Sequence, residues 1–189
     1  LLKFDNVMND QRKVIFDQRI EWMRDEAVNE IVADMRHAAV EDLVGKHLPH
    51  NRLPEQWDIA GLDRVVRDSL TLALPLHEWA REEGITPAEI RVRIIAVADR
   101  WMAAKDEKFG AAAIRHMQRM ILLHTLDNLW REHLVTLEAL RRAIGLRGYA
   151  RRQPLVEYKT EAFHLFETMT RHLQAVVTAL SMRVGIVSS

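Results

Sequence analysis

Long stretches without glycine or proline are the feature that most limits what this chain can fold into. Four such stretches cover residues 1–44, 88–109, 111–144 and 155–184. Because glycine and proline are the residues that most often end helices, each stretch can form a continuous helix. Alternating apolar and polar runs bounded by turns, which would indicate strands, do not occur. We therefore predict an all-α fold.

The first stretch predicts one long amphipathic helix. Its apolar residues recur every three or four positions, with charged residues opposite; they are Val7, Val14, Ile15, Trp22, Val28, Ile31, Val32, Met35, Ala39 and Leu43. Gly45 is the expected end of this helix. A helix that is continuous from about Asp10 would be on the order of 50 Å long. We expect a long scaffold helix over residues 1–45.

Residues 46–110 differ in composition, because four of the five prolines and two internal glycines, Gly61 and Gly84, divide them into short segments. The clearest local signal is Thr86-Pro87-Ala88-Glu89. Thr86 can cap a helix, proline suits the first helical turn, and Glu89 completes a capping box. We expect a small helical insert with a helix that begins at this point.

Residues 111–189 predict an antiparallel helical hairpin. The first arm carries an apolar stripe that includes Trp130, which we expect in the core, and the second arm carries a matching stripe from Leu155 to Val184. These stripes can pack on each other and on the first long helix. The tip of the hairpin is expected at about residues 145–153.

Composition excludes several classes of function. The 27 basic and 27 acidic side chains give no overall field that would attract nucleic acid or anionic lipid. The chain has no cysteine, and it contains neither G-x-x-x-x-G-K-[ST] nor G-x-S-x-G. A phosphate cradle, a nucleophile elbow and thiolate chemistry are therefore not indicated. We predict that this chain is not an enzyme by itself, and we assign it no catalytic residue.

The hairpin tip is the sharpest local feature. Residues 141–154 hold five arginines and no acid, and Tyr149 follows Gly148 with Arg147 and Arg151 two residues away on either side. Arginines at the end of the first arm can simply complement the helix dipole, which accounts for Arg141 and Arg142. That explanation does not cover the later arginines. We predict a contact surface formed by Leu146, Arg147, Gly148, Tyr149 and Arg151. An alternative is a hairpin that binds nucleic acid through these arginines.

Metal binding has one weak signal, the spacing Glu161-x-x-His164, which puts both side chains on one helical face. A dinuclear site in a bundle needs two such pairs and two further carboxylates, which the sequence does not supply. We expect surface ion pairing and no metal. His116, His124 and His133 step around their helix, so we interpret them as surface or edge residues.

Several long runs in order resemble the SecA family, the ATPase motors of bacterial preprotein translocation. They are the residues from Leu1 to Arg12 and those from Leu126 to Leu134 and onward through Arg147-Gly148-Tyr149-Ala150. The resemblance covers essentially the whole chain. It implies that residues 1–45 and 111–189 are similar to the helical scaffold domain, and that residues 46–110 are similar to the helical wing domain.

The resemblance also implies a role for the hairpin, which looks like the two-helix finger of that family. The finger meets the SecYEG channel and the unfolded preprotein through its tip, with a tyrosine that matches Tyr149. The further partners implied are the nucleotide-binding and preprotein-binding domains of the same chain, and no nucleic acid. ATP and magnesium belong to the full-length protein, with no cofactor in this segment. The implied location is cytoplasmic and peripheral on the cytoplasmic face of the inner membrane. Exposed apolar stripes could also cause self-association.

Overall fold

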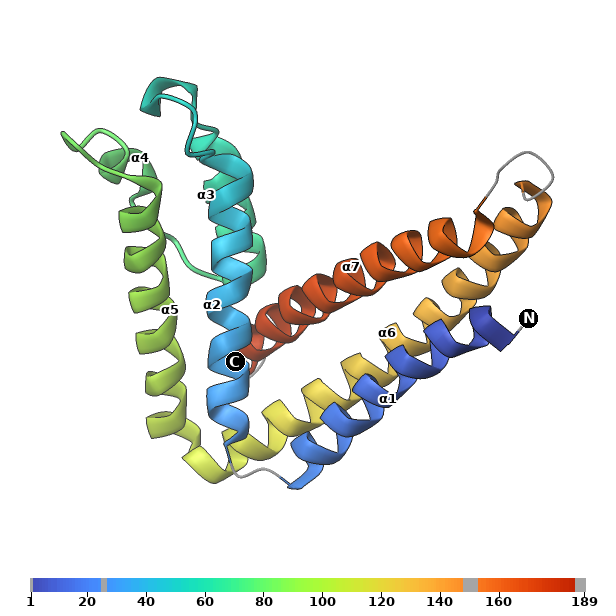
Figure 1. Cartoon of the computed structure of the whole chain (residues 1–189). Helices are drawn as coiled ribbons and strands as arrows, with labels where there is room; N and C mark the ends of the chain where they lie inside the picture. Colours follow the sequence, from blue (N-terminus) through green and yellow to red (C-terminus); the bar gives the residue numbers. More distant parts are fainter. Residues whose placement is uncertain (1, 25–26, 148–152, 186–189) are drawn as a thin grey trace. The chain divides into compact units, whose positions relative to one another are not determined.

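The computed structural model describes residues 2–24, 27–147 and 153–185 (Figure 1). Every regular element within these ranges is helical, which confirms the all-α prediction. One short 3-10 helix, η1, spans Pro54–Gln56. The α-helices are α1 (Leu2–Arg24), α2 (Val28–His47), α3 (Ile59–Leu70), α4 (Leu76–Trp79), α5 (Pro87–Phe109), α6 (Ala111–Arg147) and α7 (Pro154–Arg183).

The chain divides into two compact units. Unit 1 comprises residues 1–26 and 122–173, and unit 2 comprises residues 27–121 and 174–189. This division differs from the expected ranges, because the whole of 46–110 lies in unit 2 together with α2 and the end of α7. Residues 46–110 therefore share one apolar core with residues of α2, α6 and α7.

The expected single helix over residues 1–45 is wrong, because α1 ends at Arg24 and α2 begins at Val28. Trp22 and Val28 are both buried, in different units. Six residues along an α-helix correspond to about 240° of rotation, so one straight helix would present these two side chains on different faces. Burial of both therefore favours an interruption, although no glycine or proline marks it.

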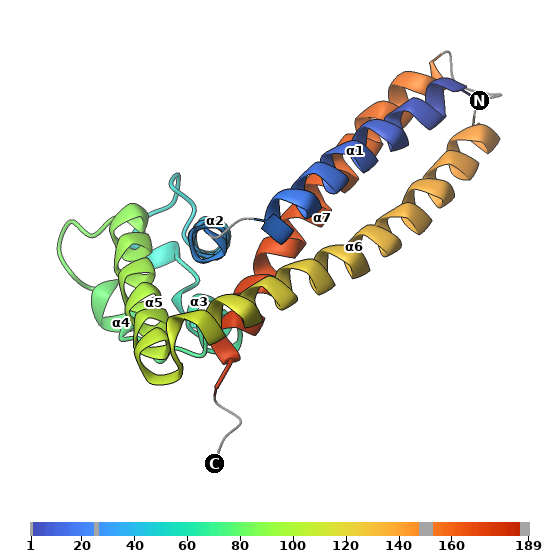
Figure 2. The ribbon, with the colours of Figure 1, turned by 90° about the horizontal axis from the view of Figure 1, so that it is seen from below.

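In unit 1, α1, α6 and α7 lie side by side in both views (Figures 1 and 2). Ile15 and Trp22 of α1 are buried. On the surface, Arg19 binds Asp127 of α6 with two hydrogen bonds, from Nε to Oδ1 at 2.9 Å and from Nη2 to Oδ2 at 3.2 Å. A two-point arginine–carboxylate contact fixes direction as well as distance, so it helps to align α1 with α6.

In unit 2, α2 packs on α3 and α5 around an apolar core. Buried Arg36 of α2 donates from Nε and Nη2 to Oδ1 of Asp99 in α5, at 2.9 and 2.7 Å. The predicted helix start is confirmed: α5 begins at Pro87, and the amide of Glu89 donates to Oγ1 of Thr86 at 3.2 Å.

The prediction that Gly45 ends the first helix is wrong, because α2 continues through this glycine to His47. The next residue, Leu48, is fully buried. The packing of that leucine in the unit 2 core outweighs the modest cost of a glycine inside a helix.

None of the described helices is both long and apolar enough to cross a membrane.

Candidate functional site

The described part of the hairpin tip carries an exposed apolar residue. Leu146 is 82% exposed, and Arg147 is the last residue of α6. The other predicted contact residues, Gly148, Tyr149 and Arg151, lie outside the described residues. The tip does not begin at Gly145 as expected, because α6 runs through this glycine. A Cβ at that position would meet no atom within 4 Å, so no neighbouring group requires glycine there.

Directly below the tip, all three helices of unit 1 meet in one apolar cluster. Its fully buried members come from α6 and α7, and partly buried residues of α1 pack against them. The ring of Phe4 in α1 meets the ring of Tyr158 in α7 edge to face, with centroids 5.1 Å apart. The buried residues are Leu137, Ile144, Tyr158 and Ala162, and the residues of α1 are Phe4, Val7 and Met8.

A salt bridge closes this cluster on one side. Nη1 of Arg141 in α6 lies 2.9 Å from Oδ1 of Asp5 in α1. The sequence explained Arg141 by the helix dipole and gave no sign of this partner, because 136 residues separate the two. The neighbouring Arg142 instead contacts Glu138 of its own helix, with Nε 3.3 Å from Oε1.

The surroundings of Tyr158 shift the pKa of its phenol. Burial raises its pKa above the ordinary value of 10; nearby Arg141 lowers the pKa, and the carboxylates of Glu138 and Asp5 raise it. Tyr158 is therefore neutral at physiological pH and belongs to the packed part of the hairpin.

A second link between the three helices lies around His133, which was expected at the surface and is buried. Nε2 of His133 lies 2.7 Å from Oε1 of Gln11 in α1. Nε2 of the same glutamine donates to the carbonyl of Ala162 in α7 at 3.1 Å. Because this bond fixes the orientation of the amide, the remaining oxygen accepts and His133 donates. One glutamine therefore joins α1, α6 and α7.

Aromatic rings enclose His133. The centroids of Trp130 and Phe166 lie 5.5 and 5.8 Å from that of the imidazole. Burial lowers the pKa of His133, so it is neutral at pH 7 with its proton on Nε2. Trp130 itself is only partly buried, contrary to expectation, and Trp22 is the more deeply buried tryptophan. The sequence missed His133 because helical spacing alone does not reveal a polar partner on another helix.

The weak metal signal does not develop into a ligand set. His164 is exposed, and its Nδ1 lies 3.4 Å from Oε2 of Glu167. Within the described ranges, no group of three or more histidine, cysteine, aspartate or glutamate side chains is placed to hold a metal ion.

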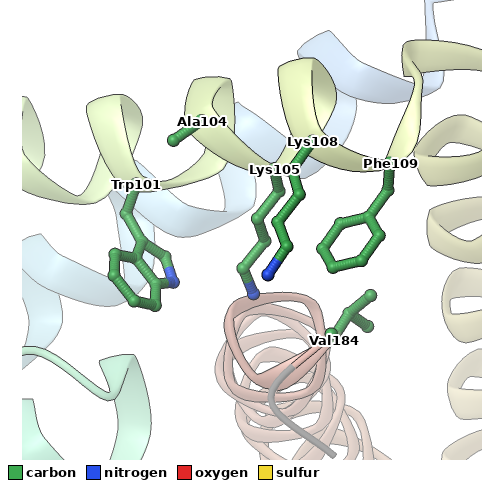
Figure 3. Close-up of a pocket in the computed structure, with 7 residues that line it drawn as sticks. Trp101, Ala104, Lys105, Lys108, Phe109 and Val184 are labelled. Atoms are coloured by element: carbon green, nitrogen blue, oxygen red, sulfur yellow. The ribbon is translucent and has the colours of Figure 1, made fainter. Parts of the chain in front are cut away.

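Unit 2 contains a different feature, which we call the α7 socket: Trp101, Lys105 and Phe109 on one face of α5. Figure 3 shows these side chains with Val184, at the end of α7, in a pocket of about 270 Å³. Nε1 of Trp101 donates to the carbonyl of Met182 at 3.3 Å. Nζ of Lys105 donates to the carbonyls of Ser181, at 3.3 Å, and of Met182. These carbonyls would otherwise lack partners at the end of the helix, so the socket caps α7.

The amine of Lys105 gives the α7 socket a measurable pH dependence. Burial lowers its pKa from 10.5 to about 8. Between these values the unfolded chain binds a proton that the folded chain has lost, so the free energy of unfolding should rise with pH. From pH 8 to 9.5, we expect the free energy of unfolding of wild type to increase relative to that of Lys105→Met. Denaturant titrations at several pH values would measure it, and a flat or falling difference would contradict the assignment.

Comparison with known proteins follows from this architecture. The sequence model of the SecA wing and scaffold domain family matches residues 1–185. The chain is 58% identical over 188 residues to protein translocase subunit SecA 1 of Rhodopseudomonas palustris, 57% identical over 187 residues to protein translocase subunit SecA of Bradyrhizobium diazoefficiens, and 53% identical over 187 residues to that of Afipia carboxidovorans. These alignments cover 99–100% of this chain but 20% of each relative, so the chain spans about a fifth of their length.

A helical hairpin fastened along its length to a third helix, in a chain with a second helical unit, defines a structural scaffold module. The family match makes the assignment specific. This chain belongs to the SecA wing and scaffold family.

Proposed function

We propose that this chain is the scaffold and wing region of a SecA-like motor, and that it couples ATP-driven domain movement to the passage of preprotein through the SecYEG channel. The observation that carries the proposal is the family match over residues 1–185. In this proposal ATP and Mg²⁺ bind elsewhere in the full-length protein, and the present chain contributes no catalytic residue. The full-length protein would act in the cytoplasm and peripherally at the cytoplasmic face of the inner membrane.

The construction of unit 1 supports a mechanical role. Helix α6 contributes residues 122–147 to unit 1, which corresponds to about 39 Å at about 1.5 Å per residue. A single helix of this length bends easily, but α6 is joined to α1 at Asp127, at His133 and at Arg141. Repeated attachment to a third helix gives a stiffer lever than two helices alone. A stiff lever can transmit the movement of one end to the other.

We further propose that the tip contacts the preprotein or the channel through Leu146, Arg147, Gly148, Tyr149 and Arg151. The exposure of Leu146 supports this proposal, because an apolar side chain at the end of a stiff hairpin can bind unfolded polypeptide without demanding one sequence. A tyrosine can stack and form a hydrogen bond in the same sequence-tolerant way. The remaining partners would be the nucleotide-binding and preprotein-binding domains of the same polypeptide.

Site-specific crosslinking tests the tip. A photoreactive residue at position 149 of the full-length protein, during translocation of a stalled preprotein, should crosslink to preprotein or to the channel. The matched control is the same residue at position 131, which is exposed on α6 in unit 1 and well before the tip; it should give neither product. Crosslinks from position 149 to other parts of the motor alone would reduce this region to a scaffold without tip contacts.

Replacement of the tyrosine should impair transport without unfolding the chain. We expect Tyr149→Ala in the full-length protein to slow translocation roughly five- to tenfold, which corresponds to about 1–1.4 kcal/mol of lost contact. Val135→Ala, at an exposed apolar position within α6, is the control and should leave the rate unchanged. The thermal midpoint of unfolding should be the same for both variants and wild type. A normal rate with Tyr149→Ala would argue against a role for this side chain.

A further inference from the structure

We propose that the first two turns of α1 form a clamp that positions the hairpin tip, with Asp5 and Arg141 as its positioning residues. We call Phe4, Asp5, Arg141 and Tyr158 the tip clamp. The inference rests on the proposed function of the tip. It adds the residues of this chain that determine the orientation of the tip.

The clamp lies at the last packed layer before the tip. Ile144 of α6 is fully buried, whereas Leu146, two residues later, is 82% exposed. Two residues correspond to about 200° of rotation, so Leu146 lies on the opposite face of α6, and Ile144 is the last buried residue of this helix whose side chain the structure describes. The contacts of Arg141 and Tyr158 with α1 lie directly behind this point, so α1 is the part of unit 1 that limits the sideways movement of the tip-bearing end.

The two contacts hold the two arms of the hairpin separately. Asp5 binds Arg141 on the first arm at 2.9 Å, and Phe4 meets Tyr158 on the second arm at 5.1 Å between ring centroids. Because Phe4 and Asp5 are consecutive residues, a shift of the first turns of α1 moves both arms together. Two contacts from adjacent residues fix an orientation, which one contact alone does not.

The energetics of the salt bridge suit a positioning role. The side chains of Arg141 and Asp5 are 27% and 40% exposed. Partly exposed ion pairs contribute little to overall stability because solvent screens them. The fixed geometry of the guanidinium still favours one placement of α1 against α6. Loss of the pair should therefore alter the position of the tip more than it alters the folding of unit 1.

Charge reversal with a matched control tests the clamp. In a full-length protein free of other reactive cysteines, spin labels at Asn9→Cys on α1 and Leu146→Cys on α6 would report the distance between α1 and the tip. Asp5→Arg alone, or Arg141→Asp alone, should broaden the distribution of this distance. The double reversal of Asp5 and Arg141 should restore it. Arg142→Asp is the control, because Arg142 pairs with Glu138 within α6 and should leave the distance unchanged.

The same reversals in unlabelled full-length protein would be assayed for translocation. We expect each single reversal to slow transport about threefold or more, and the double reversal to recover most of the rate, with thermal midpoints close to wild type. An unchanged distance distribution in Asp5→Arg would overturn the clamp, whatever the transport rate. A broadened distribution with normal transport would uphold the clamp and contradict the proposed function of the tip.

Discussion

Tyr158→Ala should lower the free energy of unfolding of unit 1 by about 3–4 kcal/mol. The Tyr158 ring is 2% exposed and packs between Phe4 of α1 and the apolar residues of α6. Removal of a buried aromatic ring loses its transfer free energy and leaves a cavity that the rigid helices cannot fill. Denaturant titration followed by circular dichroism would measure the change.

Two variants separate the ring from its surroundings. Tyr158→Phe keeps the ring and removes the hydroxyl, so it should cost less than about 1.5 kcal/mol. Val156→Ala, two residues away and 55% exposed, removes apolar atoms that contribute little and should change stability by less than about 0.5 kcal/mol. Equal losses for Val156→Ala and Tyr158→Ala would show that the cluster below the tip does not hold the helices together.

Gly110→Ala should destabilise the chain by about 2 kcal/mol, whereas Gly45→Ala should stabilise it by about 0.5–1 kcal/mol. Gly110 joins α5 to α6 with φ 87° and ψ 130°, a conformation that residues with a Cβ rarely adopt. Gly45 lies within helix α2, where alanine is the better residue.

The pair is well matched because a Cβ at either position would meet no atom within 4 Å. Steric clash is therefore excluded as a cause in both variants, and the opposite signs isolate the effect of backbone conformation. Denaturant titrations of both variants against wild type would measure it. A similar change of stability in the same direction for both would show that the backbone at Gly110 is not the constraint described.

Helical content was well predicted by the positions of glycine and proline. The capping box at Thr86 also predicted its helix correctly, because both the cap and its partner amide are local in sequence. The same reasoning failed at Gly45 and Gly145, which both lie inside helices. Glycine permits a helix to end but does not oblige it to, and at Gly45 the burial of the following Leu48 favours continuation.

The candidate site was predicted only in part. The tip residues stood out by composition, and Leu146 is exposed, but the contact role of the tip stays a prediction. The residues that hold the hairpin in place were not found. Asp5 and Arg141 are 136 residues apart, and Gln11 and His133 are 122 apart, so no window of sequence contains both partners. A buried histidine and a surface histidine have the same helical spacing until the partner helix is known.

The sequence by itself determined that this chain is helical, that a helical hairpin follows residue 110, and that the chain resembles one family throughout. Hydrophobic period, caps and helix breakers are local properties, and local energies suffice to specify them. Only the tertiary structure decided that α1 and α2 are separate helices, that α1 contacts both arms of the hairpin, and that Lys105 caps α7. Each of these depends on side chains that meet only after the helices have packed, where burial and pairing outweigh local preference.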